Sequence, residues 1–491
     1  MESPEKSSNL RQKAVKGVVW SAIESWGSQV ISFGVFFLLA RLLDPEAFGL
    51  VALASVFLNF IQLFVDQGLS TAIVQRQELE PEHLNTAFWT NIGISTLLII
   101  LSILCAGLVA EFFSQPALTP IIRWLSFSFL FSAFSSVQQA IFQRKLAFKA
   151  LAIRTLSAVV AGGVVGITMV FMGFGVWSLV GQQLANGLVQ VFTLWGVSDW
   201  RPGFKFSIKH FQELFAFGIN EVGFNVFNFF SRRGDDFLIG YFLGPTALGY
   251  YSVAYRILLV MTQLLISTTS KVALPTFSKM QQDPERMRRA FYTVTQLSSF
   301  IAFPMFLAVA ALSPELIKTI FGSQWLPSAP VMRVLTFVGL LQSVSFFNNS
   351  VILALGKPSW RLGLTVLNSV ANILSYVLVV QWGILAVASA FVIRAYLFSP
   401  IPVWMIHKLI RINLGTYLQQ YIAPLISSLV MVAVILGMKY FLGTSINLSL
   451  VLAICIVFGA GAYITMIRLS APSLFNKVIN LVKIPAFEKT R

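Results

Sequence analysis

The chain has 491 residues, of which 56% are hydrophobic and 11% are charged, and its formal net charge is +16. An average globular protein carries about 25% charged residues, so this composition excludes a water-soluble protein, which would have nowhere to bury its apolar side chains. The positive charge does not indicate a nucleic-acid partner, because the 35 basic residues are spread over many short loops and do not gather in one domain.

The apolar residues are arranged in runs of 20 or more, and a helix needs about 20 such residues to cross the hydrocarbon core of a membrane. The length and 3.6-residue period of these runs favour helices over barrel strands, which would span about 10 residues of alternating polarity. The sequence therefore predicts an all-α polytopic membrane protein with about fourteen transmembrane helices. In chain order, we expect these helices near residues 17–41, 48–74, 86–110, 121–143, 150–172, 174–197, 212–243, 247–272, 290–312, 331–355, 360–382, 384–406, 419–441 and 447–468.

The basic residues indicate which side of the membrane each loop faces, because short loops rich in Lys and Arg stay in the cytoplasm. With fourteen spans, 26 of the 35 basic residues fall on the side of the N-terminus, five fall on the opposite side and four lie within spans. This asymmetry predicts that both termini are cytoplasmic.

An internal repeat relates two halves of the chain. Residues 37–54 align without a gap with residues 237–254, and the seven identical positions include the Pro, Ala and Gly of a Pro-x-Ala-x-Gly turn. A second match pairs PIIRWLSF at 120–127 with PVMRVLTF at 330–337. These spacings imply two parallel six-helix repeats, as in transporters whose halves are related by an axis along the membrane normal. The expected domains are residues 1–206, residues 207–411, and residues 412–491 with two extra helices and a tail.

Charged side chains inside a span are costly and usually face a cavity or a partner. On the seventh span, Arg232 and Arg233 lie four and three residues before Asp236, which is the spacing of an ion pair, and Asp235 belongs to the same cluster. The cluster either lines an aqueous cavity or only joins this span to its neighbour. The other ionisable residues within spans are Glu24, Asp66, Glu221, Arg256 and Arg394.

Uncharged polar side chains form stripes on three other spans, and they either bond neighbouring helices or line a polar path for a substrate. The stripes are Ser128, Ser132, Ser135 and Gln139 on the fourth span, Gln182, Asn186 and Gln190 on the sixth, and Ser345 and Asn349 on the tenth.

Metal and disulfide sites are not predicted. His83, His210 and His407 fall at loops or span ends, without the spacing of a metal-ligand cluster, and no cofactor motif appears. Cys105 and Cys455 both lie inside apolar runs, so no disulfide framework is implied.

Three stretches carry a family resemblance: ARLLDPEAFGLVALA at 40–54, VDQGLSTAIVQR at 65–76 and FLGPTALGYYSVAYR at 242–256. With these, the chain resembles bacterial polysaccharide exporters, the Wzx-type O-antigen and capsule flippases of the multidrug/oligosaccharidyl-lipid/polysaccharide (MOP) superfamily, from residue 10 to about residue 470. The resemblance implies a two-lobed, V-shaped bundle that works by alternating access. It also implies that the protein flips undecaprenyl-diphosphate-linked oligosaccharide from the cytoplasmic to the periplasmic leaflet of the bacterial inner membrane. Other polysaccharide assembly proteins are further candidate partners.

Under this resemblance, Arg232, Arg256 and Arg394 are the candidate ligands of the diphosphate, because a guanidinium donates two parallel hydrogen bonds to a phosphate. No basic residue of the N-terminal half is expected at such depth, so its amides and hydroxyls would accommodate the glycan. The glycan path is assigned to Gln182, Asn186, Gln190 and Asn349. Glu24, Asp66 and Glu221 are the candidates for ion coupling, since a buried carboxylate can take up and release a proton.

Three alternatives stay open. A lipid-linked murein precursor flippase would share fourteen spans and cavity arginines. A drug/cation antiporter of the same superfamily would normally have twelve spans and use acidic residues alone in its cavity. A membrane glycan polymerase would need catalytic groups, but the longest extracytoplasmic loop, near 313–330, offers only Glu315 and Lys318 as ionisable residues. We therefore expect a transporter and not an enzyme.

Overall fold

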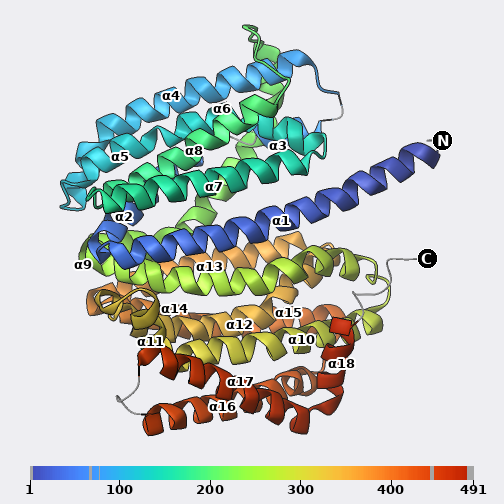
Figure 1. The fold of residues 1–491 in the computed structure, drawn as a ribbon. Helices are drawn as coiled ribbons and strands as arrows, with labels where there is room; N and C mark the ends of the chain where they lie inside the picture. Colours follow the sequence, from blue (N-terminus) through green and yellow to red (C-terminus); the bar gives the residue numbers. More distant parts are fainter. Residues whose placement is uncertain (1–3, 66–68, 77, 443–446, 484–491) are drawn as a thin grey trace. The chain divides into compact units, whose positions relative to one another are not determined.

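The computed structural model describes residues 4–65, 69–76, 78–442 and 447–483. Over these ranges the ordered elements are all helices, without a strand, as the sequence predicts (Figure 1). Residues 1–249 contain α1 (Pro4–Leu42), α2 (Pro45–Gln62), α3 (Leu69–Gln75), α4 (Pro81–Phe112), α5 (Leu118–Ser126), α6 (Ser128–Arg144), α7 (Phe148–Phe171), α8 (Trp177–Val197) and the first part of α9 (Ile208–Ser278). The remaining helices are α10 (Pro284–Ala311), α11 (Ser313–Ile320), α12 (Ser328–Ala354), α13 (Pro358–Val379), α14 (Ile384–Phe398), α15 (Pro400–Ile410), α16 (Leu414–Leu442), α17 (Leu448–Ser470) and α18 (Pro472–Lys483), with 3-10 turns η1 (Ser323–Trp325) and η2 (Val380–Trp382).

Eleven helical segments of the described chain are long and apolar enough to cross a membrane. Each of them falls on one of the fourteen expected spans. The other three expected spans correspond to α8 and to the two parts of α9, on either side of a break at Gly244. The polytopic, all-helical class is therefore confirmed, whereas the number fourteen stays a prediction.

Two boundaries differ from the expected spans. The second expected span, 48–74, is not one helix, because α2 ends at Gln62 and a separate short helix, α3, begins at Leu69. The expected spans 212–243 and 247–272 join in α9, where Gly244 has a φ of 81°. That left-handed conformation is accessible to glycine at little steric cost, and the following Pro245 favours a break there.

The chain divides into two compact units, residues 1–249 and 250–491. In the first unit, α1 packs on α7, α7 on α8, α8 on α6 and α6 on α4 (Figure 1). In the second unit, α10 packs on α12 and α16, α16 packs on α17, and α14 contacts both α12 and α13. The expected domain limits at residues 206 and 411 describe a sequence repeat, and they stay predictions.

Glycines on α7 allow its neighbours to approach closely, as small residues do in membrane helix packing. A Cβ atom added to Gly162 would lie 2.8 Å from the carbonyl oxygen of Gln182 on α8. One added to Gly163 would lie 2.5 Å from a methyl carbon of Val35 on α1. The close packing of α8 and of α1 against α7 therefore depends on these small residues.

The two repeated Pro-x-Ala-x-Gly turns contact each other within the first unit. A Cβ atom on Gly49 would lie 1.7 Å from the carbonyl oxygen of Pro245, and one on Gly249 would lie 2.0 Å from the carbonyl oxygen of Pro45. Each glycine thus faces the proline of the other turn. This reciprocal contact agrees with two related halves, and the repeat itself stays a prediction.

Candidate functional site

A polar cavity of about 350 Å³ lies inside the first unit. Its walls are α6 and α8, with contributions from α3 and from the C-terminal end of α2 and the residues after it. Of the described residues, fourteen line the cavity, and none of these is charged. Eleven carry an amide or a hydroxyl: Gln62, Ser70, Ser128, Ser132, Ser135, Ser136, Gln139, Gln143, Gln183, Asn186 and Gln190.

The cavity forms because two polar stripes face each other. The α6 stripe recurs every three or four residues and therefore occupies one side of that helix. On α8, Gln183, Asn186 and Gln190 follow the same spacing, and the side-chain nitrogen Nε2 of Gln190 donates a hydrogen bond to Oδ1 of Asn186 at 2.6 Å. The structure thus places the stripe predicted on the fourth span opposite two of the three residues predicted on the sixth.

Gln182 and Asn349 have other positions. The backbone and Cβ of Gln182 lie against Gly162 and Gly166 of α7, and the cavity is lined by Gln183 in its place. Asn349 is exposed on α12 in the second unit. A strict four-residue repeat selects position 182, whereas the cavity-facing side of α8 follows the mixed three- and four-residue spacing of 183, 186 and 190.

Polar atoms near the cavity have unused hydrogen-bonding capacity. The hydroxyl of Ser135 is buried without a protein partner. Gln138, one turn further along α6, is fully buried, and neither its amide oxygen nor its amide nitrogen has a protein partner. Such groups are uncommon in a packed interior, because an unpaired buried polar atom costs free energy. The interior next to the cavity therefore contains polar atoms that protein groups leave unpaired.

A buried cation lies behind the cavity wall. Arg154 on α7 is 9% exposed, and its Nη1 donates a hydrogen bond to Oε1 of the cavity residue Gln139 at 2.7 Å. Its Nη2 contacts Oγ1 of Thr155 at 3.3 Å, and that hydroxyl lies 2.7 Å from Oε1 of Glu24 on α1. Arg154 thus adds a buried cation to the N-terminal half. The expectation that this half places no basic residue as deep in the membrane as Arg232, Arg256 and Arg394 stays a prediction.

The charges of the seventh span pair in one of the two expected ways. Nη1 of Arg233 lies 2.8 Å from Oδ2 of Asp236, and Oδ1 of Asp235 accepts the backbone N–H of Asp236 at 3.0 Å. Both carboxylates are buried, whereas the side chains of Arg232 and Arg233 are exposed. The described part of α9 thus combines an ion pair with an accessible guanidinium, Arg232.

The remaining predicted residues are divided between the second unit and the undescribed parts. Arg256 is exposed on α9. Arg394 on α14 is half-buried, donates a hydrogen bond to Oδ1 of Asn368 on α13, and lies over the ring of Phe391 at 5.5 Å. Asp66 and the side chain of Glu221 lie outside the described residues.

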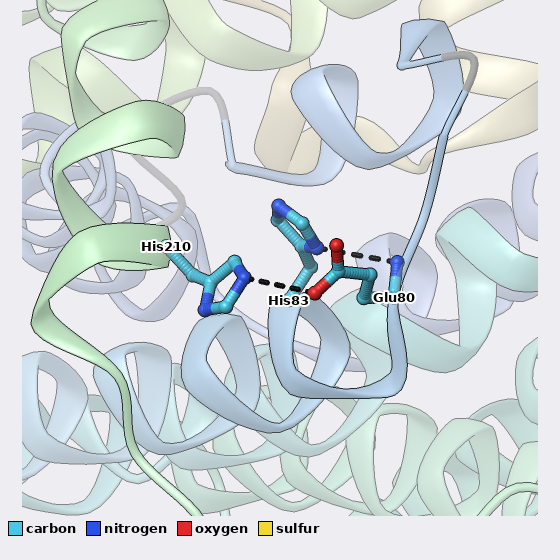
Figure 2. Close-up of side chains that lie close together, drawn as sticks. All are labelled: Glu80, His83 and His210. Carbon is cyan, nitrogen blue, oxygen red and sulfur yellow. Dashed lines mark hydrogen bonds and ion pairs between the residues drawn. The ribbon is translucent and has the colours of Figure 1, made fainter.

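A separate cluster of possible metal ligands lies outside the cavity, where Glu80 and His83 at the start of α4 meet His210 at the start of α9 (Figure 2). The sequence predicts no metal site, because the histidines fall at loops or span ends without the spacing of a metal-ligand cluster, and His83 and His210 are 127 residues apart. No local spacing could have indicated this cluster.

Comparisons with known proteins place the chain among polysaccharide biosynthesis proteins. The family model described as "Polysaccharide biosynthesis protein" matches residues 38–330, which is more than half of the chain. The teichuronic acid biosynthesis protein TuaB of Bacillus subtilis is 27% identical over 96% of this chain and 98% of its own length. The succinoglycan biosynthesis transport protein ExoT of Rhizobium meliloti is 29% identical over 68% of this chain and 67% of its own.

The fold also matches a solved structure. The Lipid II flippase MurJ, in an inward closed conformation, superposes with a TM-score of 0.75 and 16% sequence identity, covering 94% of this chain and all of that one. At this identity the likeness shows a shared fold. The resemblance to polysaccharide exporters seen in the sequence is thereby confirmed at the level of family and fold.

Proposed function

We propose, because this chain belongs to the polysaccharide biosynthesis protein family, that it flips an undecaprenyl-diphosphate-linked oligosaccharide from the cytoplasmic to the periplasmic leaflet of a bacterial inner membrane. TuaB is a teichuronic acid biosynthesis protein and ExoT is a succinoglycan biosynthesis transport protein, which supports a transport role in polysaccharide synthesis. The protein works by alternating access and breaks no covalent bond of its cargo. Its partners are the bilayer and the lipid-linked oligosaccharide.

The neutral polar cavity of the first unit carries this proposal. A sugar presents many hydroxyls, each of which donates and accepts hydrogen bonds, and side-chain amides and hydroxyls offer the complementary donors and acceptors. The described lining contains no charge that would favour an ionic cargo. A lining of this kind accepts different sugars, because it pairs with hydroxyls without requiring one fixed arrangement of them.

The diphosphate is assigned to the guanidiniums of Arg232, Arg256 and Arg394. The exposure of Arg232 and Arg256 supports this assignment, since a phosphate can reach them. Arg394 has its orientation fixed by Asn368, which suits a directional contact. The buried Arg154 adds a positive charge to the first unit, so the division between a glycan-binding and a diphosphate-binding half is less sharp than the sequence suggests.

Glu24, Asp66 and Glu221 remain the proposed groups for ion coupling. Glu24 accepts a hydrogen bond from Thr155 and lies in the network of Arg154, so a change in its protonation would reach the cavity wall through Gln139. This route gives Glu24 a physical connection to the cargo site. Neutral substitutions at all three carboxylates should therefore reduce export and its dependence on the ion gradient.

Complementation tests the proposed cargo. The gene is introduced into bacterial strains that each lack one defined surface-glycan flippase, and surface polysaccharide is measured by labelling intact cells. We expect restored glycan in at least one strain. The murein-precursor alternative is tested in a strain in which the lipid-linked murein precursor flippase can be depleted. If the gene restores growth of that strain but restores surface glycan in none of the others, the cargo is the murein precursor.

Cavity variants test the site itself. Gln183→Leu combined with Gln190→Leu removes two cavity amides and should slow export about tenfold or more, since each hydrogen bond contributes about 1 kcal/mol. Thr96→Val is the matched control, because this exposed threonine on α4 bonds only its own helix, at the carbonyl of Ile92. Normal export by the double variant at normal protein abundance would contradict a cargo path through this cavity.

A further inference from the structure

Two helix starts that are distant in sequence meet at a group of metal-binding side chains. Glu80 precedes the first turn of α4, His83 lies in that turn, and His210 lies in the first turn of α9. One ligand atom from each residue lies within 4.8 Å of the other two. Figure 2 shows the carboxylate of Glu80 beside the two imidazoles, with Oε2 of Glu80 3.2 Å from Nε2 of His210.

Both ring nitrogens of His83 have hydrogen-bond partners, so a cation bound at Nδ1 would take the place of the backbone N–H of Glu80. Its Nδ1 accepts the backbone N–H of Glu80 at 3.2 Å and lies beside the Glu80 carboxylate (Figure 2). Its Nε2 lies 3.4 Å from Oε2 of Glu213 on α9. An imidazole that binds a metal through one nitrogen usually donates the N–H of the other to a carboxylate, which orients the ring. Glu213 is placed for that role.

The two histidines of this group are largely buried, which restricts their movement, whereas Glu80 is exposed to solvent. The side chain of His83 is 2% exposed, that of His210 is 14% exposed, and that of Glu80 is 64% exposed. The two imidazole rings are held 4.1 Å apart between centroids. Ligands of tetrahedral zinc are about 3.3 Å apart, given zinc–ligand distances of about 2.0 Å. The three ligand atoms lie within 4.8 Å of one another, so cation binding requires rotations of these side chains that bring the atoms closer together. The exposed Glu80 leaves an entry path from solvent.

Nearby ion pairs leave one carboxylate of the group to face a cation. Glu80 and Glu213 supply two negative charges, and Nη2 of Arg76 pairs with Glu213 at 2.6 Å, which leaves the Glu80 carboxylate to offset the charge of a divalent ion. Two imidazoles with one carboxylate suit zinc and similar transition metals, whereas magnesium and calcium prefer oxygen ligands alone.

We propose that Glu80, His83 and His210 form a site for a divalent transition-metal cation such as Zn²⁺, with Glu213 orienting His83 from behind. The site joins the start of α4 to the start of α9. The segment that leads into α9 is already attached to α4 by two hydrogen bonds at Gly203. Trp89 donates to the carbonyl of Gly203 at 2.9 Å, and Oδ1 of Asn85 accepts the backbone N–H of Gly203 at 2.9 Å. A bound cation would extend this attachment from the connecting segment to α9 itself.

Metal binding to the purified full-length protein tests the site directly. The protein, in detergent and without a polyhistidine tag, is stripped with a chelator and dialysed against Zn²⁺, and bound zinc is measured by elemental analysis. We expect one zinc per chain, with affinity at least tenfold weaker in His210→Ala and in Glu80→Gln. His407→Ala is the matched control, because this histidine on α15 bonds the carbonyl of Ile412 in the second unit, and it should retain the wild-type affinity.

Two further measurements separate a built site from loss of fold or from general charge attraction. His210→Gln keeps a side chain that can bond Glu80, so it should unfold at the wild-type temperature without zinc but lose the rise that zinc produces. A large excess of Mg²⁺ should leave zinc bound. Absence of bound zinc in the wild type, equal zinc binding by His210→Ala and His407→Ala, or displacement of zinc by Mg²⁺ would each overturn the proposal. These readouts do not depend on transport, so they stand apart from any failure of the proposed flippase function.

Discussion

Arg154 illustrates how a single side chain connects a helix interface to the cavity. Its guanidinium bonds Gln139 in the cavity wall, and Thr155 links the same region to Glu24 on α1. Because the group is buried, its charge must be compensated within the protein, and the partners that do so belong to three different helices. Changes at this residue should therefore affect both the stability of the first unit and the shape of the cavity.

We predict that Arg154→Met lowers the stability of the protein by about 2 kcal/mol, the usual contribution of a hydrogen bond to a charged group. Unfolding in detergent, followed by tryptophan fluorescence, measures the effect. Arg361→Met is the control, since Arg361 is exposed on α13. The loss should be smaller in a Glu24→Gln background, because the two residues share one network. Equal losses in both backgrounds would show that Glu24 and Arg154 are independent.

At the residue scale, the sequence predicts side chains that recur along one helix. It does not predict groups of side chains that come from distant segments of the chain. Asn186, Gln190 and the α6 stripe line the cavity, because helical periodicity alone places them on one face. Arg154 lies in the second turn of α7, close in sequence to the basic residues Arg144, Lys145 and Lys149, and its contact with Gln139 depends on how α6 packs against α7. Likewise, the meeting of His83 with His210 depends on tertiary packing that no local pattern records.

The start of α2, which contains Pro45 and Gly49, is the clearest case of an element whose sequence is dictated by a close approach. Gly49 and Gly249 each face a proline carbonyl of the other turn, and a backbone atom cannot rotate away as a flexible side chain would. The close approach of the two segments therefore depends on the absence of a side chain at both glycines. This gives the shared glycines of the sequence repeat a physical role.

We predict that Gly49→Ala and Gly249→Ala each destabilise the protein by about 1 to 3 kcal/mol, the usual cost of overpacking. Gly107→Ala on α4 is the control, because a Cβ atom there meets nothing within 4 Å, and alanine favours a helix by about 1 kcal/mol over glycine. Thermal unfolding of the three variants in detergent provides the comparison. If Gly49→Ala is as stable as Gly107→Ala, the reciprocal contact does not contribute to folding.

At the element scale, hydropathy predicted most helices, because the membrane requires long apolar runs wherever a helix crosses it. It failed where a run continues through a break in the helix, as in the expected span 48–74, since a hydropathy window records polarity and not backbone conformation. It is also least decisive for α8, whose amides face the cavity and lower its apolar content. The polar face of this helix therefore weakens the hydropathy signal that would reveal it as a span.

For the whole molecule, the number of crossings decides where the termini lie. The eleven helical segments selected by length and composition would, if they alone crossed, put the two termini on opposite sides of the membrane. Adding α8 and the two parts of α9 gives fourteen crossings and puts the two termini on the same side of the membrane. The charge asymmetry of 26 basic residues against five favours the second arrangement, because it needs every one of these crossings.

We predict that reporters fused after residues 199 and 283 are cytoplasmic, whereas one inserted after Gly244 is periplasmic. The three positions flank the two parts of α9 and therefore test both of its crossings. A reporter after residue 442 should be periplasmic and one after residue 470 cytoplasmic, with an N-terminal fusion as the cytoplasmic reference. Paired alkaline phosphatase and green fluorescent protein fusions, normalised to protein abundance, distinguish the two compartments. If Gly244 reports the cytoplasm together with residues 199 and 283, α9 does not cross the membrane twice, and its buried Asp235 and Asp236 must be explained by packing on the cytoplasmic side.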